Sequence, residues 1–116
     1  MISKGVFLAP CAGVVGSVFV GKGSSIWYGA VVRGDDAPVI IGDNTNIQDL
    51  VMIVPKDIMR VRDKETKTLV IGNRVTVGHA AVINNAVIED ECLIGMGAVI
   101  SYGAKVCSHA MVAAGK

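Results

Sequence analysis

Aromatic residues are scarce in this chain of 116 residues: they make up 4 %, although hydrophobic residues as a whole make up 52 %. The interior must therefore be built from Val, Ile, Ala and Leu. Stacked layers of such residues, many of them β-branched, fill a narrow prism without large rings. The 14 glycines suit the tight corners of such a prism. At this length, residues 1–116 are expected to form one domain.

An excess of charge of one sign is also lacking. The net charge is +1, and no basic run interleaved with aromatic residues occurs, so a nucleic-acid partner is excluded. No apolar run approaches the roughly 20 residues that a membrane span requires. Residues 1–4 lead straight into the first repeat, so no signal or transit peptide is expected there, although a presequence could have been removed.

Cysteines are few, odd in number and widely spaced: Cys11, Cys92 and Cys107. Their spacing matches neither a metal-binding pattern nor a disulfide framework. Cys92 occupies an interior-type position of the repeat described below. We therefore predict that its side chain acts as a small buried hydrophobe and not as a reactive thiol.

What the chain does contain is a repeat of six residues, each unit carrying an aliphatic residue that a small or turn-forming residue usually follows. A period of six fits neither an α-helix nor a simple alternating strand. It predicts a β-solenoid in which each unit supplies one short strand and one corner. After Ile83 a single step of five residues occurs. The aliphatic positions are Val14, Val20, Ile26, Val32, Ile41, Ile47, Ile53, Ile71, Val77, Ile83, Ile88, Ile94, Ile100, Val106 and Val112.

Two interruptions and one end stand out from the repeat. The phase breaks at 34–40, where a Gly-Asp-Asp-Ala-Pro stretch predicts a short corner loop. The charged residues of 55–69 predict a solvent-exposed insertion, either a mobile polar loop or a docking surface for a partner. No capping sequence follows Val112, so either the chain continues beyond Lys116 or another molecule covers that end.

Four stretches, 23–35, 41–49, 75–79 and 93–98, resemble the γ-class carbonic anhydrases in their motifs, order and spacing. They include Arg-x-Asp, Asn-x-Gln-Asp and Val-Gly-His. The resemblance implies an all-β, left-handed parallel β-helix that assembles as a trimer, with metal sites at the subunit interfaces. It also implies three histidine ligands for zinc or another divalent ion. Such a site would lower the pKa of bound water toward about 7 for attack on carbon dioxide.

The positions of these three ligands hold Val54, His79 and Asn84. Catalytic zinc needs about three protein ligands, valine cannot coordinate, and an amide oxygen is a weak substitute for imidazole. A trimer of this chain alone is therefore expected to bind no cofactor. By resemblance, one subunit supplies the first and third ligands and its neighbour the second. His79 would then either complete a zinc site in a mixed heterotrimer or remain as an interface residue without a metal.

The other motif residues are expected at the same interface. By resemblance, Arg33, Asp35, Asn46 and Asp49 make contacts between subunits. Gln48 would orient water or bicarbonate, a catalytic role only if a metal is bound. Two further residues, Tyr102 and His109, could form an acid–base pair, but nothing relates them to a metal or nucleophile. Both are expected at the surface.

The function expected from the resemblance is structural. The stretches 23–29 and 108–115 and the charged insertion are similar to the branch that forms a heterotrimer on the matrix side of the membrane arm of mitochondrial complex I (NADH:ubiquinone oxidoreductase). Homologous chains and membrane-arm subunits would be its partners. Alternatives are a carbonic anhydrase active only at mixed interfaces, a bacterial cytoplasmic relative, and a hexapeptide acyltransferase with His79 as base. Whether the chain is an enzyme stays open, with a structural role favoured; if it is active, it would be a carbonate dehydratase.

Overall fold

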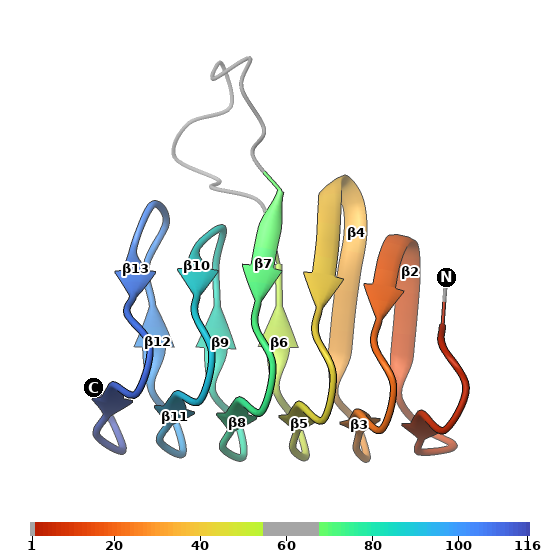
Figure 1. The fold of residues 1–116 in the computed structure, drawn as a ribbon, viewed down its shortest axis with the longest axis horizontal. Coiled ribbons are helices and arrows are strands. Elements are labelled where there is room, and N and C mark those ends of the chain that lie inside the picture. The colour runs from red at the N-terminus through yellow and green to blue at the C-terminus, as the bar shows by residue number, and fades with distance from the viewer. Residues whose placement is uncertain (1, 55–67) are drawn as a thin grey trace.

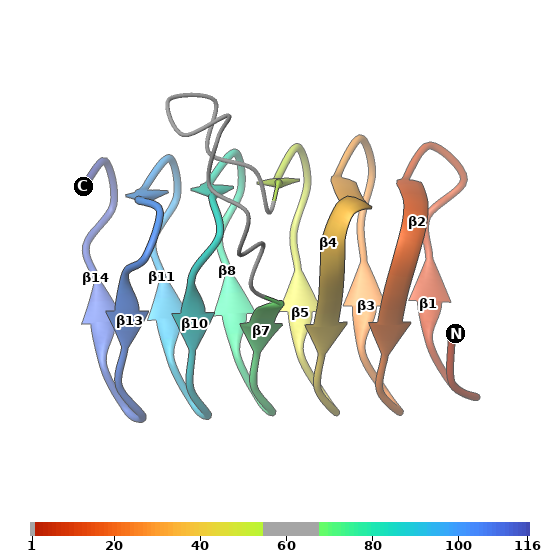
Figure 2. The ribbon, with the colours of Figure 1, turned by 90° about the horizontal axis from the view of Figure 1, so that it is seen from above.

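The computed structural model of the protein describes residues 2–54 and 68–116. In this part the chain winds into a stack of short parallel strands, with the two ends of the chain at opposite ends of the stack (Figures 1 and 2). The charged insertion predicted at 55–69 lies outside the described residues except for Thr68 and Leu69. Leu69 begins strand β7 and is fully buried, so the core resumes before the predicted end of the insertion.

Each strand pairs with strands of the neighbouring coils, which are distant from it in the sequence, and every pair is parallel. One sheet forms the first face of the prism. Its strands, in spatial order, are β1 (Phe7–Leu8), β3 (Ser25–Ile26), β5 (Asn46–Ile47), β8 (Thr76–Val77), β11 (Leu93–Ile94) and β14 (Met111–Val112).

A second sheet folds around the other two faces. The long strands β2 and β4 contribute to both faces and so join them. On the second face they are continued by β6 (Met52–Ile53), β9 (Val82–Ile83) and β12 (Val99–Ile100). On the third face they are continued by β7 (Leu69–Ile71), β10 (Val87–Ile88) and β13 (Lys105–Val106).

The phase break predicted at 34–40 falls inside β4 (Val31–Ile41), which pairs along its length with β2 (Gly13–Val20). The corner is therefore made by a bend of the paired strands, where the pairing shifts register between Gly16 and Val18 (Figure 1). Gly16 has φ 80°, and a Cβ there would overlap the backbone of Gly34. Only glycine fits this close approach of two backbones.

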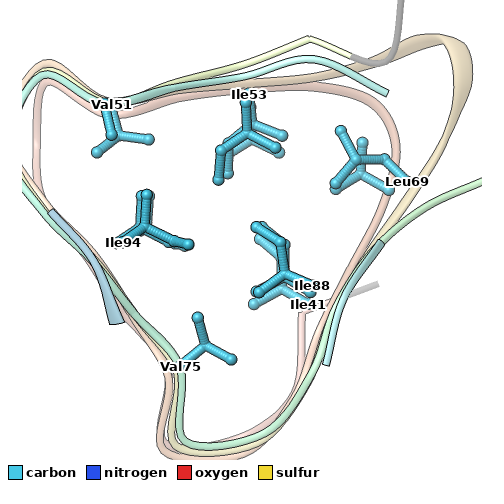
Figure 3. Packing of buried hydrophobic residues seen from close by; sticks show 14 of the residues in the cluster. Ile41, Val51, Ile53, Leu69, Val75, Ile88 and Ile94 are labelled. Carbon is cyan, nitrogen blue, oxygen red and sulfur yellow. The ribbon is translucent and has the colours of Figure 1, made fainter. Parts of the chain in front are cut away.

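The core is a set of aliphatic columns, as the repeat predicts. In-register pairing places Ile26, Ile47, Val77 and Ile94 directly on one another, and all four are fully buried. Figure 3, viewed along the stack, shows such side chains superposed inside a triangular outline of backbone. The five aromatic residues all have exposed or half-buried positions outside this core. The scarcity of rings therefore reflects an interior that is too narrow for them.

The five-residue step changes the length of one coil. Val82 pairs with Val99 across the step, and Val87 pairs with Lys105 after it, one residue further along the chain. Both pairings keep aliphatic residues inside, at Ile83, Ile88 and Ile100. The repeat can therefore lose a residue at a corner without moving a side chain to the wrong face of the sheet.

One corner of the prism is held by side chains that bond to the preceding coil. The Oδ1 atoms of Asp43, Asn73 and Asp90 accept hydrogen bonds from the backbone N–H groups of Lys22, Asp43 and Asn73, at 2.9, 2.7 and 2.8 Å. A Cβ on Gly42 would collide with the Asn73 side chain. The ladder satisfies backbone donors that the sheets leave unpaired at the turn.

Cys92 is buried, which confirms the prediction made from its place in the repeat. Its thiol donates to the backbone carbonyl of Cys107 at 3.0 Å, whereas the side chains of Cys11 and Cys107 are exposed. Within residues 2–54 and 68–116 there is no helix of the length and apolarity needed to cross a membrane.

Replacing Ile94 by alanine tests the columnar core. We expect Ile94→Ala to lower the free energy of unfolding by about 2–5 kcal/mol, because it leaves a cavity between two coils that cannot close without breaking their register. Leu93→Ala, on the outward face of the same strand, is the matched control and should cost much less. Urea denaturation followed by circular dichroism measures both. Equal losses would contradict the assignment of inward and outward positions.

Thiol labelling tests the placement of the cysteines. In the native protein, a disulfide reagent such as Ellman's should react quickly with Cys11 and Cys107 and slowly with Cys92, which becomes reactive on unfolding. A Cys92→Ala variant should lose only the slow phase. If Cys92 reacted as quickly as the exposed pair, its burial would be contradicted.

Candidate functional site

A hollow of about 370 Å³ opens on the first face of the prism, at the corner where the chain leaves β3, β5 and β8. It gathers residues that follow these strands on consecutive coils. The lining residues are Trp27, Tyr28, Asn46, Gln48, Asp49 and His79. Among them are three of the motif residues predicted from sequence and the histidine of the Val-Gly-His motif.

Register fixes this grouping. The Leu50 N–H donates to the Tyr28 carbonyl at 3.0 Å, and the Ala80 N–H donates to the Asp49 carbonyl at 2.9 Å. Tyr28, Asp49 and His79 therefore precede the same turn on successive coils. Leu50 and Ala80 make that turn with φ of 62° and 60°. These values lie in the left-handed region, which residues other than glycine rarely adopt.

The polar side chains of the hollow differ from those of the laddered corner. Within the described chain, the side chains of Gln48, Asp49 and His79 make no hydrogen bond or ion pair with other residues. His79 is exposed, and Gln48 and Asp49 are half-buried. Three polar side chains without intrachain partners therefore converge on one open concavity.

Asn46 is the exception in the hollow, because its amide oxygen is bonded within the chain. The Asn46 Oδ1 accepts hydrogen bonds from the Trp27 indole N–H at 2.7 Å and the Ser25 hydroxyl at 2.8 Å. The indole N–H also lies 3.0 Å from the Ser25 oxygen. Sequence reasoning missed Ser25, Trp27 and Tyr28 as site residues. Their signal was their place in the stretch 23–35, which carries the family resemblance and lies one coil before the Asn-x-Gln-Asp motif.

Arg33 and Asp35 form an ion pair of 2.6 Å within the chain. They lie two residues apart on β4, so their side chains leave the same side of the strand. The pair is solvent-accessible, with side chains 45 % and 37 % exposed. In the single chain this pair is a surface interaction, and it does not line the hollow.

Val54 and Asn84 lie side by side at the corner where the second face ends. Ile53 pairs with Ile83, and the Val54 N–H donates to the Ile83 carbonyl at 2.9 Å. The Asn84 Nδ2 donates to the Ile100 carbonyl at 3.1 Å. Strand β9 separates this corner from His79. The described residues contain no group of three His, Cys, Asp or Glu side chains that could hold a metal ion.

Tyr102 and His109 do not belong to the hollow. His109 is exposed at the laddered corner, where its N–H donates to the Asp90 carbonyl at 3.1 Å. Tyr102 is half-buried near the turn that contains Gly103. The structure therefore does not bring these two residues to the candidate site.

No family model matches the chain. A mitochondrial γ-carbonic anhydrase 2 of Arabidopsis thaliana is 50 % identical over 116 residues, which are 99 % of this chain and 41 % of the relative. A probable carbonic anhydrase of Methanocaldococcus jannaschii is 44 % identical over 100 residues, 86 % of this chain and 58 % of the relative. The chain thus spans about two fifths to three fifths of the length of these relatives.

Among solved structures, a hexapeptide transferase family protein of Anaplasma phagocytophilum superposes with a TM-score of 0.74 and 27 % identity, over 99 % of this chain and 70 % of that one. The fold is thus a hexapeptide-repeat, left-handed parallel β-helix. Within that class, the chain is 47–50 % identical to two γ-carbonic anhydrases of Arabidopsis over 99 % of its length. The chain belongs to the γ-carbonic anhydrase-like family.

Proposed function

We propose that this chain is a γ-carbonic anhydrase-like subunit with a degenerate metal site, and that it acts structurally in a trimer with homologous chains. The observation that carries the proposal is the pair formed by Val54 and Asn84. They occupy adjacent coils at one corner, in the two positions where the resemblance implies histidine ligands from a single subunit.

These residues do not fit a catalytic zinc ion. The side chain of Val54 offers no donor atom. The Asn84 amide already donates to the Ile100 carbonyl, which leaves one neutral oxygen. His79 alone retains a good ligand atom, and a catalytic zinc site requires about three. A trimer of identical chains would therefore contribute one histidine to each interface, and no catalytic step through a metal follows from it.

Assembly with homologous chains is supported by the surface between the two corners. The outward positions of the second face are apolar on four successive coils: Val31, Met52, Val82 and Val99. Met52 and Val99 are 41 % and 50 % exposed. Apolar surface of this kind, bordered by the polar hollow and the Arg33–Asp35 pair, is typical of an interface between subunits. Asn46 and Asp49 would meet the neighbour from the hollow.

The mitochondrial names of the Arabidopsis relatives support a mitochondrial location. On the resemblance to mitochondrial subunits, we place the heterotrimer on the matrix side of the inner membrane, in the membrane arm of respiratory complex I. Membrane-arm subunits would be the further partners. Recovery of the tagged chain in the intact complex, and in its membrane-arm subcomplex after dissociation, would test this assignment.

A second candidate function is catalysis at a mixed interface, where His79 would complete the site of a homologous chain that carries the other two histidines. The favouring observation is that His79 is exposed, lines the hollow together with Gln48, and makes no side-chain hydrogen bond or ion pair within the part of the chain that the structure describes. Gln48 could then orient water or bicarbonate. The shared fold supports the acyltransferase alternative, but no contact within the hollow favours it.

Restoring the lost ligands tests the degenerate site. We expect the wild-type homo-oligomer to retain little zinc after dialysis against a weak chelator. Val54→His combined with Asn84→His should bring zinc to near-stoichiometric levels, because the two imidazoles join His79 of a neighbour. Elemental analysis by mass spectrometry measures the metal. Adding His79→Ala to the double variant is the control and should abolish the gain. Stoichiometric zinc in the wild-type protein would contradict the proposal.

Replacing His79 tests the mixed-interface alternative. In a heterotrimer with a homologous chain that carries all three histidines, His79→Ala should lower the metal content if this chain lends a ligand. His109→Ala is the matched control, because His109 is exposed and lies outside the hollow. Unchanged metal content in the His79→Ala heterotrimer would rule out the alternative and leave the structural role.

A further inference from the structure

The hollow contains one side chain whose orientation is fixed by its neighbours. An indole N–H can only donate a hydrogen bond, so the atom of Asn46 that lies 2.7 Å from Trp27 must be its oxygen. The Ser25 hydroxyl donates to the same oxygen at 2.8 Å. The two donors settle which end of the amide points inward, a choice that is otherwise ambiguous for an asparagine.

The other end of the amide is then directed away from Trp27 and Ser25. Asn46 is half-buried and lines the hollow, and its Nδ2 atom makes no hydrogen bond within the described chain. No buried side-chain nitrogen or oxygen in the described part lacks a partner, so this NH₂ group is not a buried orphan. It is an accessible donor beside Gln48 and His79.

The Trp27 ring is itself restrained. It packs against Phe7 on the preceding coil, with ring centroids 4.8 Å apart, and lies 6.3 Å from the Tyr28 ring. Its backbone N–H donates to the Ile47 carbonyl at 2.9 Å, next to Asn46. Indole and amide are therefore anchored on adjacent coils whose register cannot slip. A donor held in this way loses little conformational entropy when it binds.

We infer that Trp27 and Ser25 are positioning residues that hold the Asn46 amide with its NH₂ group directed into the hollow. There it donates a hydrogen bond to an oxygen atom of whatever fills the hollow. That oxygen could belong to a neighbouring subunit or to a small carboxylate-like anion. An oxygen from a neighbouring subunit rests on the trimer of the proposed function, whereas an oxygen from an anion does not. Neither source requires a metal.

The experiment uses three substitutions in the full chain. Trp27→Phe keeps a ring against Phe7 but removes the N–H, and Ser25→Ala removes the hydroxyl. Asn46→Asp keeps an oxygen toward both donors and replaces the outward NH₂ by a second oxygen. Because Asn46→Asp adds a negative charge, Thr76→Asp is the matched control: Thr76 follows Asn46 in the same outward column and lies outside the hollow.

Two measurements distinguish the source of the oxygen. Sedimentation gives the association constant between subunits. A titration with sodium formate, followed through the side-chain NH₂ signals in nitrogen-15 spectra, reports a small anion. We expect Asn46→Asp to weaken at least one of these by about tenfold, the scale of one lost hydrogen bond, and to weaken it more than Thr76→Asp does. Trp27→Phe and Ser25→Ala should weaken the same measurement several-fold.

Non-additivity is the decisive readout, because a packing role for Trp27 would not produce it. Adding Trp27→Phe to Asn46→Asp should cause no further loss. Additive losses, a Trp27→Phe protein that behaves as wild type in both measurements, or no response in either would overturn the inference. A monomeric chain that still binds formate with non-additive losses would refute the trimer and leave the positioning role standing.

Discussion

In-register stacking of one coil on the next is the constraint on which the rest of this structure depends. Hydrogen bonds between parallel strands place equivalent positions of successive coils on one another, so that Ile26 lies on Ile47 and Ile47 on Val77. A slip of one residue would turn each inward aliphatic side chain outward, which costs hydrophobic burial on every coil at once. The same register also places Tyr28, Asp49 and His79 before one turn. The site is therefore a consequence of the core and needs no separate scaffold.

The corners of the prism differ in how they satisfy polar groups, and this difference supports the choice of the hollow as the candidate site. At the laddered corner, backbone N–H groups of the preceding coil donate hydrogen bonds to the side-chain oxygens of Asp43, Asn73 and Asp90. At the hollow, the side chains of Gln48 and His79 make no hydrogen bond or ion pair within residues 2–54 and 68–116. Polar groups that contribute nothing to the stability of their own chain are available for contacts with another molecule. The first corner therefore stabilises the fold, and the second is the surface to which we assign the proposed contacts with another molecule.

Much of the fold could be predicted from sequence because the repeat places an aliphatic residue at each buried position of the coils. The period of six, the five-residue step and the interior place of Cys92 each follow from side chains that must alternate between core and solvent. The bend of β4 was less accessible. The Gly-Asp-Asp-Ala-Pro stretch indicates a change of direction, but only the pairing with β2 determines that the strand continues through it.

The candidate site was predictable in its motif residues and not in its arrangement. Asn46, Gln48, Asp49 and His79 were assigned roles from their motifs, whereas Trp27 lies in a resembling stretch but was assigned no role. Its indole reaches Asn46 only because the pairing of Ser25 with Asn46 places the two side chains on adjacent coils. Such a contact depends on side-chain rotamers and on the number of residues in one coil. Neither quantity can be read from the composition or the spacing of a motif.

The three positions where the resemblance implies metal ligands lie at opposite edges of the second face: His79 precedes β9, whereas Val54 and Asn84 follow β6 and β9. Val54 and Asn84 directly follow the paired strands β6 and β9, where the Val54 N–H donates to the Ile83 carbonyl and the Asn84 amide donates to the Ile100 carbonyl. His79 belongs to a different corner and projects toward solvent. In the trimer proposed above, Val54 and Asn84 would belong to the subunit's own site and His79 to that of a neighbour, so the two groups would be able to change separately.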